Sequence, residues 1–405
     1  MESSVASPDT LMAGGTRADA RAAAIPWYLT AVLFASTSVI VGVIWDISWH
    51  QTIGRDSFLT PAHIAIYLGG IAAGIACGWL ALKTTFGGTE EEKGRSVKFW
   101  GFRAPLGAWI AIWGAFAMVT SAPFDDWWHN AYGLDVEILS PPHVVLALGI
   151  MAIQVGALIM ALSWQNRSGA EGERNRRLSF AYLYGAGMLI ATFAVLLTEY
   201  TYPNDMHASP FYRVTAGAFP LVLFAVGRAG GMKWSATVAA LVYSGLILAM
   251  MWILPLFPAE PLLAPIRRTV THMVPPTFPL LLVFPAIAID LVLARTGEGG
   301  RWKDWGIAAV GSVAFVLVFL AVSWFFSEFL LSPAARNYVF QADNNWPYTS
   351  SVGGWQHEFW NEDIAADGRI TAGAFAAGAW WAIPIGIVSA RAGLMWGNWM
   401  ARVRR

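Results

Sequence analysis

The sequence predicts an all-α protein that crosses a membrane many times and keeps both termini on the cytoplasmic side. Of its 405 residues, 56% are apolar and only 13% are charged, whereas globular domains are roughly 45–50% apolar and about 25% charged. The apolar residues gather into runs of about 20, the length at which a helix crosses a hydrocarbon core about 30 Å thick. Lys and Arg concentrate on alternate connections between these runs. We therefore expect about ten transmembrane helices, arranged as five hairpins that open outward.

The runs follow one another with a regular alternation of charge between them. A hydropathy window of about 20 residues places them at 27–48, 61–83, 104–123, 142–164, 178–199, 211–228, 233–254, 276–295, 305–331 and 371–393. All but six of the 26 basic residues lie at the termini or after an even-numbered run, the exceptions being Arg55, Arg213, Arg267, Arg268, Arg336 and Arg369. By the positive-inside rule, the termini and those connections are cytoplasmic. The other connections then face outward, toward the periplasm of a bacterial-type plasma (inner) membrane.

The chain divides into three expected regions. Residues 1–26 are polar, rich in Ala, Gly and Ser, and without a hydrophobic signal core, which is typical of a disordered cytoplasmic tail. Residues 27–164 form a four-helix region that carries two repeated motifs. Residues 165–405 add six expected helices and a long outer loop at 331–370.

The charge balance and the single cysteine exclude several kinds of site. The formal net charge is zero, which gives no reason to expect nucleic acid as a partner. Cys77 lies alone within the second run, so the sequence predicts neither a disulfide framework nor a cysteine-ligated zinc or iron–sulfur site. We expect Cys77 to pack as a small apolar residue.

Three side chains that can bind metal converge on the first hairpin. Asp46 and His50 are four residues apart at the end of the first run, so they share one face of a helix. Thr60-Pro61 is a helix start signal, and His63 follows it at the beginning of the second run. The hairpin thus offers one carboxylate and two imidazoles to a common ion.

The second hairpin repeats this set with one more residue in its loop. Asp125 and His129 end the third run, again four residues apart, and His143 opens the fourth run just after Ser140-Pro141-Pro142. Asp126 is an alternative ligand, but only Asp125 has the spacing of four. Because two such sets occur in matching positions, we expect both to have the same function, which is metal binding.

The two sets indicate a metal that prefers nitrogen and oxygen ligands. All seven His of the sequence lie in expected outer loops or at outer helix ends, and imidazole is the commonest metal ligand of proteins. Three ligands leave positions open for water, dioxygen or substrate, and they suit copper, zinc or non-heme iron, with copper favoured by affinity. The structural alternative is an Asp–His pair that caps a helix or reaches toward the interface. Capping, however, needs no second His at the next helix start.

Other ionisable residues are weaker candidates. We interpret the remaining histidines as solvated loop residues and as weaker candidates for metal ligands. They are His207 beside Asp205, His272, and His357 beside Glu358 or Glu362. We expect Asp290 to pair with Arg295 near the cytoplasmic end of its run. The acidic connection at 87–98 is expected to be a solvated turn.

The first motif, Asp-x3-His-x12-His, resembles the copper-site motif in the C subunit of particulate methane and ammonia monooxygenases. The surrounding residues, Ser-Trp-His-Gln-Thr followed by Arg-Asp-Ser-Phe-Leu-Thr-Pro-Ala-His, are similar to that subunit as well. The second set is similar to a second copper site of that subunit, although the family's set begins with Asn where this chain has Asp125. The resemblance covers about residues 27–164, because the family's C subunit is considerably shorter than this chain.

The resemblance implies a copper-dependent membrane monooxygenase, or its metal-bearing subunit, that oxidises a small apolar substrate or ammonia with dioxygen. An outside donor such as quinol would supply electrons. The implied catalytic and metal-binding residues are Asp46, His50 and His63 for one copper, and Asp125, His129 and His143 for another; zinc would fit the same ligands. The family works as a multi-subunit complex in membrane lipid, so self-association or other monooxygenase subunits are expected as partners.

Two other classes of protein stay open. A non-catalytic membrane protein that binds or transfers copper would use the same ligands, although the sequence has no Met-rich or Cys-rich stretch of the kind that handles Cu(I). A transporter subunit would need a polar path across the bilayer, which the scarcity of charge inside the runs disfavours.

Overall fold

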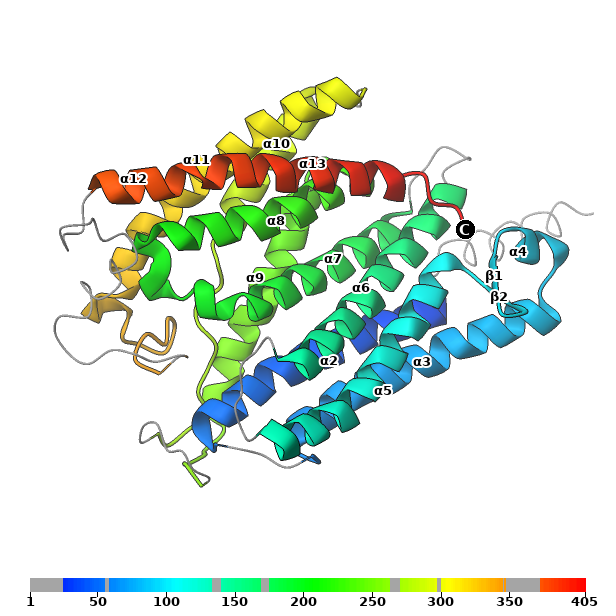
Figure 1. Cartoon of the computed structure of the whole chain (residues 1–405), viewed down its shortest axis with the longest axis horizontal. Helices are drawn as coiled ribbons and strands as arrows, with labels where there is room; N and C mark the ends of the chain where they lie inside the picture. Colours follow the sequence, from blue (N-terminus) through cyan, green and yellow to red (C-terminus); the bar gives the residue numbers. More distant parts are fainter. Residues whose placement is uncertain are drawn as a thin grey trace, which may run out of the picture.

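The protein is an all-α, multi-pass membrane protein, as the sequence predicts. The computed structural model describes residues 25–54, 58–132, 140–168, 175–262, 270–296, 300–344, 346 and 372–405. Within these residues, nine helices are long and apolar enough to cross a membrane. Figure 1 shows that the beginning of the first helix and the C-terminus lie at the same end of the bundle. An even number of crossings would produce this arrangement.

Two tight hairpins form the first part of the bundle. The first consists of α2 (Trp27–Thr52) and α3 (Pro61–Gly87), and the second of α5 (Leu106–Tyr132) and α6 (Pro141–Ser168). They pack side by side, with α3 against α5 and α2 against α6. The sites predicted from the sequence lie where each hairpin turns.

Glycines bring the two helices of the second hairpin into backbone contact. A Cβ added to Gly114 would lie 2.6 Å from the carbonyl oxygen of Gly149, and one added to Gly149 would lie 2.8 Å from the carbonyl oxygen of Gly114. Gly107 and Gly156 face each other in the same way one heptad further along. Small residues permit such close approach between membrane helices, so this hairpin has little freedom to change its spacing.

The connection between the two hairpins is ordered. It contains the short helix α4 (Glu90–Gly94) and an antiparallel β-hairpin of β1 (Val97–Phe99) and β2 (Phe102–Ala104). Thr89 and Glu92 form a capping box at the start of α4. The charged turn expected at 87–98 is therefore partly regular structure.

The second part of the bundle is less regular. Its helices are α7 (Arg176–Leu196), α8 (Ser209–Gly230), α9 (Ser235–Ile253), α10 (Val283–Thr296), α11 (Arg301–Leu330), α12 (Ala372–Trp380) and α13 (Ala382–Met400), with the short helices η2 (Thr198–Tyr200), η3 (Pro203–His207), η4 (Leu254–Leu256) and η5 (Pro333–Ala335). The main partner of α8 is α13, and α7 packs against α2, α6 and α9. A single hydrophobic core joins these helices to the first four.

The run expected to be a helix at 276–295 is helical only from Val283 onward. The residues before it lie outside regular secondary structure and are mostly buried. Prolines at 275, 276 and 279 explain the difference, since proline cannot donate a backbone hydrogen bond and breaks a helix interior. Non-helical backbone at membrane depth is tolerated where protein covers it. Here the amide of Leu280 donates to the hydroxyl of Tyr243 at 2.9 Å.

Asp290 does not pair with Arg295, contrary to the expectation from the sequence. Its carboxylate accepts hydrogen bonds from the amides of Ala236 (3.2 Å) and Thr237 (2.8 Å) and from the Thr237 hydroxyl (2.7 Å). These amides belong to the first turn of α9, whose own N-cap residue supplies no side-chain bond. Asp290 on α10 therefore caps α9 from outside the helix.

Candidate metal centre

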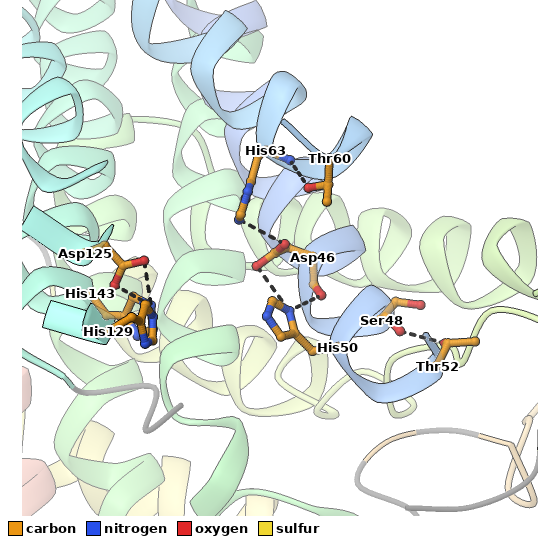
Figure 2. Close-up of polar contacts among 9 residues, drawn as sticks. All are labelled: Asp46, Ser48, His50, Thr52, Thr60, His63, Asp125, His129 and His143. Atoms are coloured by element: carbon orange, nitrogen blue, oxygen red, sulfur yellow. Dashed lines mark hydrogen bonds and ion pairs between the residues drawn. The ribbon is translucent and has the colours of Figure 1, made fainter. Parts of the chain in front are cut away.

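The first set of predicted ligands lies at the end of α2, where Asp46 contacts both histidines, but of the two sets only the second brings one ligand atom from each residue within 4.8 Å of the other two. Asp46 Oδ2 lies 3.6 Å from His50 Nδ1, and Asp46 Oδ1 lies 3.3 Å from His63 Nε2. Figure 2 shows the carboxylate of Asp46 between the two rings. The three side chains are a fifth to a quarter exposed, so the site is reachable from outside the protein.

Local helix chemistry places both histidines. His50 follows Asp46 by one helical turn, while His63 is the third residue of α3. Thr60 is the N-cap of α3, its hydroxyl oxygen accepts from the amide of His63 at 3.3 Å, and Pro61 occupies the first helical position. This cap is the start signal read from the sequence.

A main-chain carbonyl selects the tautomer of His50. Its Nδ1 lies 2.9 Å from the carbonyl oxygen of Asp46. A carbonyl can only accept, so Nδ1 donates in this contact, and a neutral ring would then carry its lone pair on Nε2. Metal-binding histidines commonly donate their second ring N–H to a carbonyl in this way.

The second set of predicted ligands forms a compact cluster. Asp125 Oδ2 lies 3.5 Å from His129 Nε2, and Asp125 Oδ1 lies 3.4 Å from His143 Nε2. One ligand atom from each of the three residues lies within 4.8 Å of the other two. Pro123 lies within α5, but the helix continues to Tyr132, which keeps Asp125 and His129 on one face.

The second cluster is close to the size of a site for one small cation. Ligands about 2.05 Å from a tetrahedral ion are separated by about 3.3 Å. The two Asp125–His distances of 3.5 and 3.4 Å involve different carboxylate oxygens, while one ligand atom from each residue lies within 4.8 Å of the other two. Asp125 Oδ1 is also buried, and its 3.4 Å contact with His143 Nε2 does not have the geometry of a hydrogen bond. A buried carboxylate oxygen without a hydrogen bond is costly, and a bound cation would reduce that cost.

The structure favours Asp125 over Asp126 as the ligand. Asp126 accepts a hydrogen bond from the side-chain amide of Asn130 at 3.3 Å, whereas Asp125 contacts both imidazoles. The helical spacing of four had indicated the same choice.

The end of α2 is held in place on the side away from its ligands. The Ser48 hydroxyl donates to the carbonyl oxygen of Val274 at 2.6 Å, and the amide of Val274 donates to the Thr52 hydroxyl at 2.8 Å. Figure 2 shows Ser48 and Thr52 pointing away from His50. The buried non-helical segment before α10 thus fixes the helix turn that carries His50, a contact that the sequence did not reveal.

The other histidines do not join these clusters. His207 Nε2 lies 3.0 Å from the Ser327 hydroxyl and 3.1 Å from Glu328 Oε1. Asp205, its expected neighbour, instead accepts from the amide of Tyr202. His272 is exposed, with Nδ1 2.9 Å from the Thr271 hydroxyl. His357, Glu358 and Glu362 lie outside the described residues.

Burial lowers the pKa of His207 below its ordinary value of 6.5, and the charge of Glu328 opposes this effect. The imidazole is therefore neutral at pH 7. It joins the loop between α7 and α8 to the end of α11. A pair separated by 120 residues has no local sequence signature.

No protein-family model, no curated protein and no solved structure matches this chain. The fold and the side-chain geometry define its class as a multi-pass α-helical membrane protein with an Asp–His–His cluster. Any narrower assignment is a proposal.

Proposed function

We propose that the chain is a copper-dependent membrane monooxygenase, or the metal-bearing subunit of one, that oxidises a small apolar substrate or ammonia with dioxygen. The observation that carries the proposal is the cluster of Asp125, His129 and His143, with separations near those of a ligand set and a buried carboxylate oxygen that lacks a hydrogen bond. The repeated motif and its resemblance to the monooxygenase C subunit support the same reading.

The chain's own residues have definable roles in this proposal. In each set, the aspartate supplies the negative charge that balances a cation, and two imidazoles supply neutral nitrogen ligands. Copper, when bound, would supply the redox chemistry with dioxygen. The apolar helix faces around the sites would let small apolar molecules reach them from the bilayer.

Asp125 distinguishes this chain from the family pattern, in which Asn begins the second set. A carboxylate adds one negative charge to the site and is expected to hold a cation more tightly than an amide would. Asp125→Asn is therefore an informative variant, because it restores the family's residue without changing the side-chain shape.

A second candidate is a membrane protein that binds and transfers copper without catalysis. The partial exposure of all three ligands in each set favours it, since side chains that are 20–32% exposed leave a route for an ion to enter and leave.

Metal analysis and turnover separate these candidates. The full chain, purified in nanodiscs after growth with copper, should contain stoichiometric copper. Asp125→Ala and His143→Ala should lose the share held by the second cluster, whereas Asp126→Ala and His272→Gln should keep it. Failure to find protein-bound copper would end both candidates. If copper is bound but the supplied reductant supports no oxidation of ammonia or a small hydrocarbon, the non-catalytic copper-transfer protein is the remaining candidate.

A further inference from the structure

The β-hairpin between α3 and α5 has one aromatic face and one basic face. It lies with α4 at the end of the bundle opposite the Asp–His clusters (Figure 1). Phe99 is paired with Phe102, and Lys98 with Arg103. Because directly opposed residues share a face and successive residues alternate between faces, the two phenylalanines lie on one side and the two cations on the other.

The tip of this hairpin holds a tryptophan in an unfavourable backbone conformation. Trp100 and Gly101 have φ values of 46° and 87°, which is the pattern of a two-residue type I′ turn. That turn favours Asn at its first position, and a bulky residue with positive φ is a rare outlier. Trp100 contacts the rings of Phe99 and Trp113 at 5.0 and 6.2 Å between centroids, yet it is 81% exposed. The protein itself thus covers little of this ring.

The aromatic face of the hairpin continues the lipid-facing surface of two transmembrane helices. Phe102 contacts Phe86 at the end of α3, and Phe99 contacts Trp113 on α5, with centroids 6.2 and 5.9 Å apart. Exposed apolar side chains run along both helices toward these contacts, namely Ile75, Trp79, Leu82 and Phe86 on α3, and Trp113, Phe116 and Val119 on α5. The hairpin therefore lies where these faces leave the hydrocarbon core.

The charges around the hairpin leave two cations unmatched. The three acidic residues of α4 each pair with one basic residue: Glu92 with Lys83 (2.7 Å), Glu91 with Arg95 (2.7 Å) and Glu90 with Lys93 (3.3 Å). Among the described residues, no carboxylate lies within ion-pair distance of Lys98 or Arg103. One guanidinium nitrogen of Arg103 donates to the carbonyl oxygen of Lys93 at 2.9 Å, which fixes its position near Lys98.

We propose that the β1–β2 hairpin is a membrane-surface anchor that binds anionic phospholipid. Trp100 and the two phenylalanines enter the interfacial region of the leaflet, where amphipathic aromatic rings are favoured. Lys98 and Arg103 face the phosphate groups of that leaflet. The positive-inside rule makes this the cytoplasmic leaflet, whose anionic lipids attract basic residues near a membrane helix. The proposal does not depend on the metal centre.

The depth of the hairpin tip tests the first part of the proposal. Cys77 is the one cysteine of the chain and is buried, so a nitroxide label on Trp100→Cys reports from the tip. In nanodiscs that hold one copy of the full chain, the label should be more accessible to dioxygen than to a water-soluble nickel chelate. A label on Tyr338→Cys, in the exposed loop after α11, provides the comparison.

Lipid retention tests the second part. Native mass spectrometry of the chain from equimolar phosphatidylcholine and phosphatidylglycerol should show preferential retention of phosphatidylglycerol. Lys98→Gln should lower this preference about fivefold, the effect of roughly one basic residue at an anionic surface. Trp100→Asn should also lower it, and because Asn suits the turn, misfolding of the hairpin would not explain the loss. Trp302→Gln removes another tryptophan, 86% exposed, at the start of α11 and should have no effect.

Three results would overturn the proposal. The label at position 100 could be as accessible to the nickel chelate as the label at position 338. Lys98→Gln and Trp100→Asn could both retain phosphatidylglycerol like the original protein. Finally, protection of the label that appears only when two copies share a nanodisc would identify the hairpin as a contact between copies.

Discussion

Replacing Gly149 by Ala should weaken the metal binding proposed for the second cluster without touching any of its three residues. The added Cβ would lie 2.8 Å from the carbonyl oxygen of Gly114 and 3.1 Å from the amide nitrogen of Met118, both of them backbone atoms of α5. Ordinary contacts begin near 3.4 Å, so α5 and α6 must separate by about 0.6 Å at this point. Overpacking of this kind typically costs about 1–3 kcal/mol.

The separation should grow toward the ligands. If the contact of Gly107 with Gly156 acts as a pivot, Gly149 lies seven residues from it and His143 thirteen, or about 10 and 20 Å at 1.5 Å per residue. A displacement of about 0.6 Å at Gly149 then becomes roughly 1 Å at His143. Metal–ligand distances tolerate about 0.2 Å. We expect the affinity of the second cluster to fall about tenfold or more, as with lost supporting contacts.

This change in affinity is measured by competition with a chelator of known affinity, with the metal content of the second cluster as the readout. Gly78→Ala is the matched control, since a Cβ at Gly78 meets nothing within 4 Å, and it should retain both affinity and thermal stability. Any metal held by the first cluster should be retained in both variants. Unchanged affinity in Gly149→Ala, or an equal loss in Gly78→Ala, would refute the geometric argument.

Two further predictions concern contacts away from the metal. Asp290→Ala removes three hydrogen bonds to the first turn of α9 and should lower the free energy of unfolding by about 1.5–3 kcal/mol, measured by denaturant titration in detergent. Arg295→Gln should change this free energy little. A larger loss in Arg295→Gln than in Asp290→Ala would contradict the capping role and favour the Asp290–Arg295 pair expected from the sequence. His207 has a lowered folded-state pKa, so below about pH 6.5 the unfolded chain binds more protons than the folded one, and the stability that this residue contributes is complete above that pH and is lost as the pH falls. The thermal midpoint of His207→Gln should therefore fall less between pH 7 and pH 5 than that of the original protein, and parallel pH profiles would contradict this.

Local patterns were sufficient to predict which side chains come together in the two Asp–His–His sets. The spacing of four fixes Asp46 and His50, or Asp125 and His129, on one helix face, and a Thr-Pro or Ser-Pro start fixes the second histidine in the first turn of the next helix. These relations hold within a few residues of chain, so tertiary packing has little chance to override them. Hydropathy likewise predicted most of the transmembrane helices.

Contacts between distant residues could not be predicted in this way. Asp290 caps a helix that starts more than fifty residues earlier, and His207 meets Ser327 and Glu328 on a helix far along the chain. Hydropathy also treats the segment before α10 as part of a helix, because average polarity does not register that its prolines lack backbone donors. Each of these cases depends on how helices pack, which a single sequence does not state.

The hydrogen bonds between α2 and Val274 mean that the two halves of the chain are not separable modules. All six proposed ligands precede residue 165, so a shortened protein ending there would retain every one of them. Such a fragment would nevertheless lose the partner of Ser48 and Thr52 and leave the final turn of α2 untethered. From the motifs alone, the first four helices look like a self-sufficient unit. The orientation of His50 nevertheless depends on hydrogen bonds to a residue more than two hundred positions downstream.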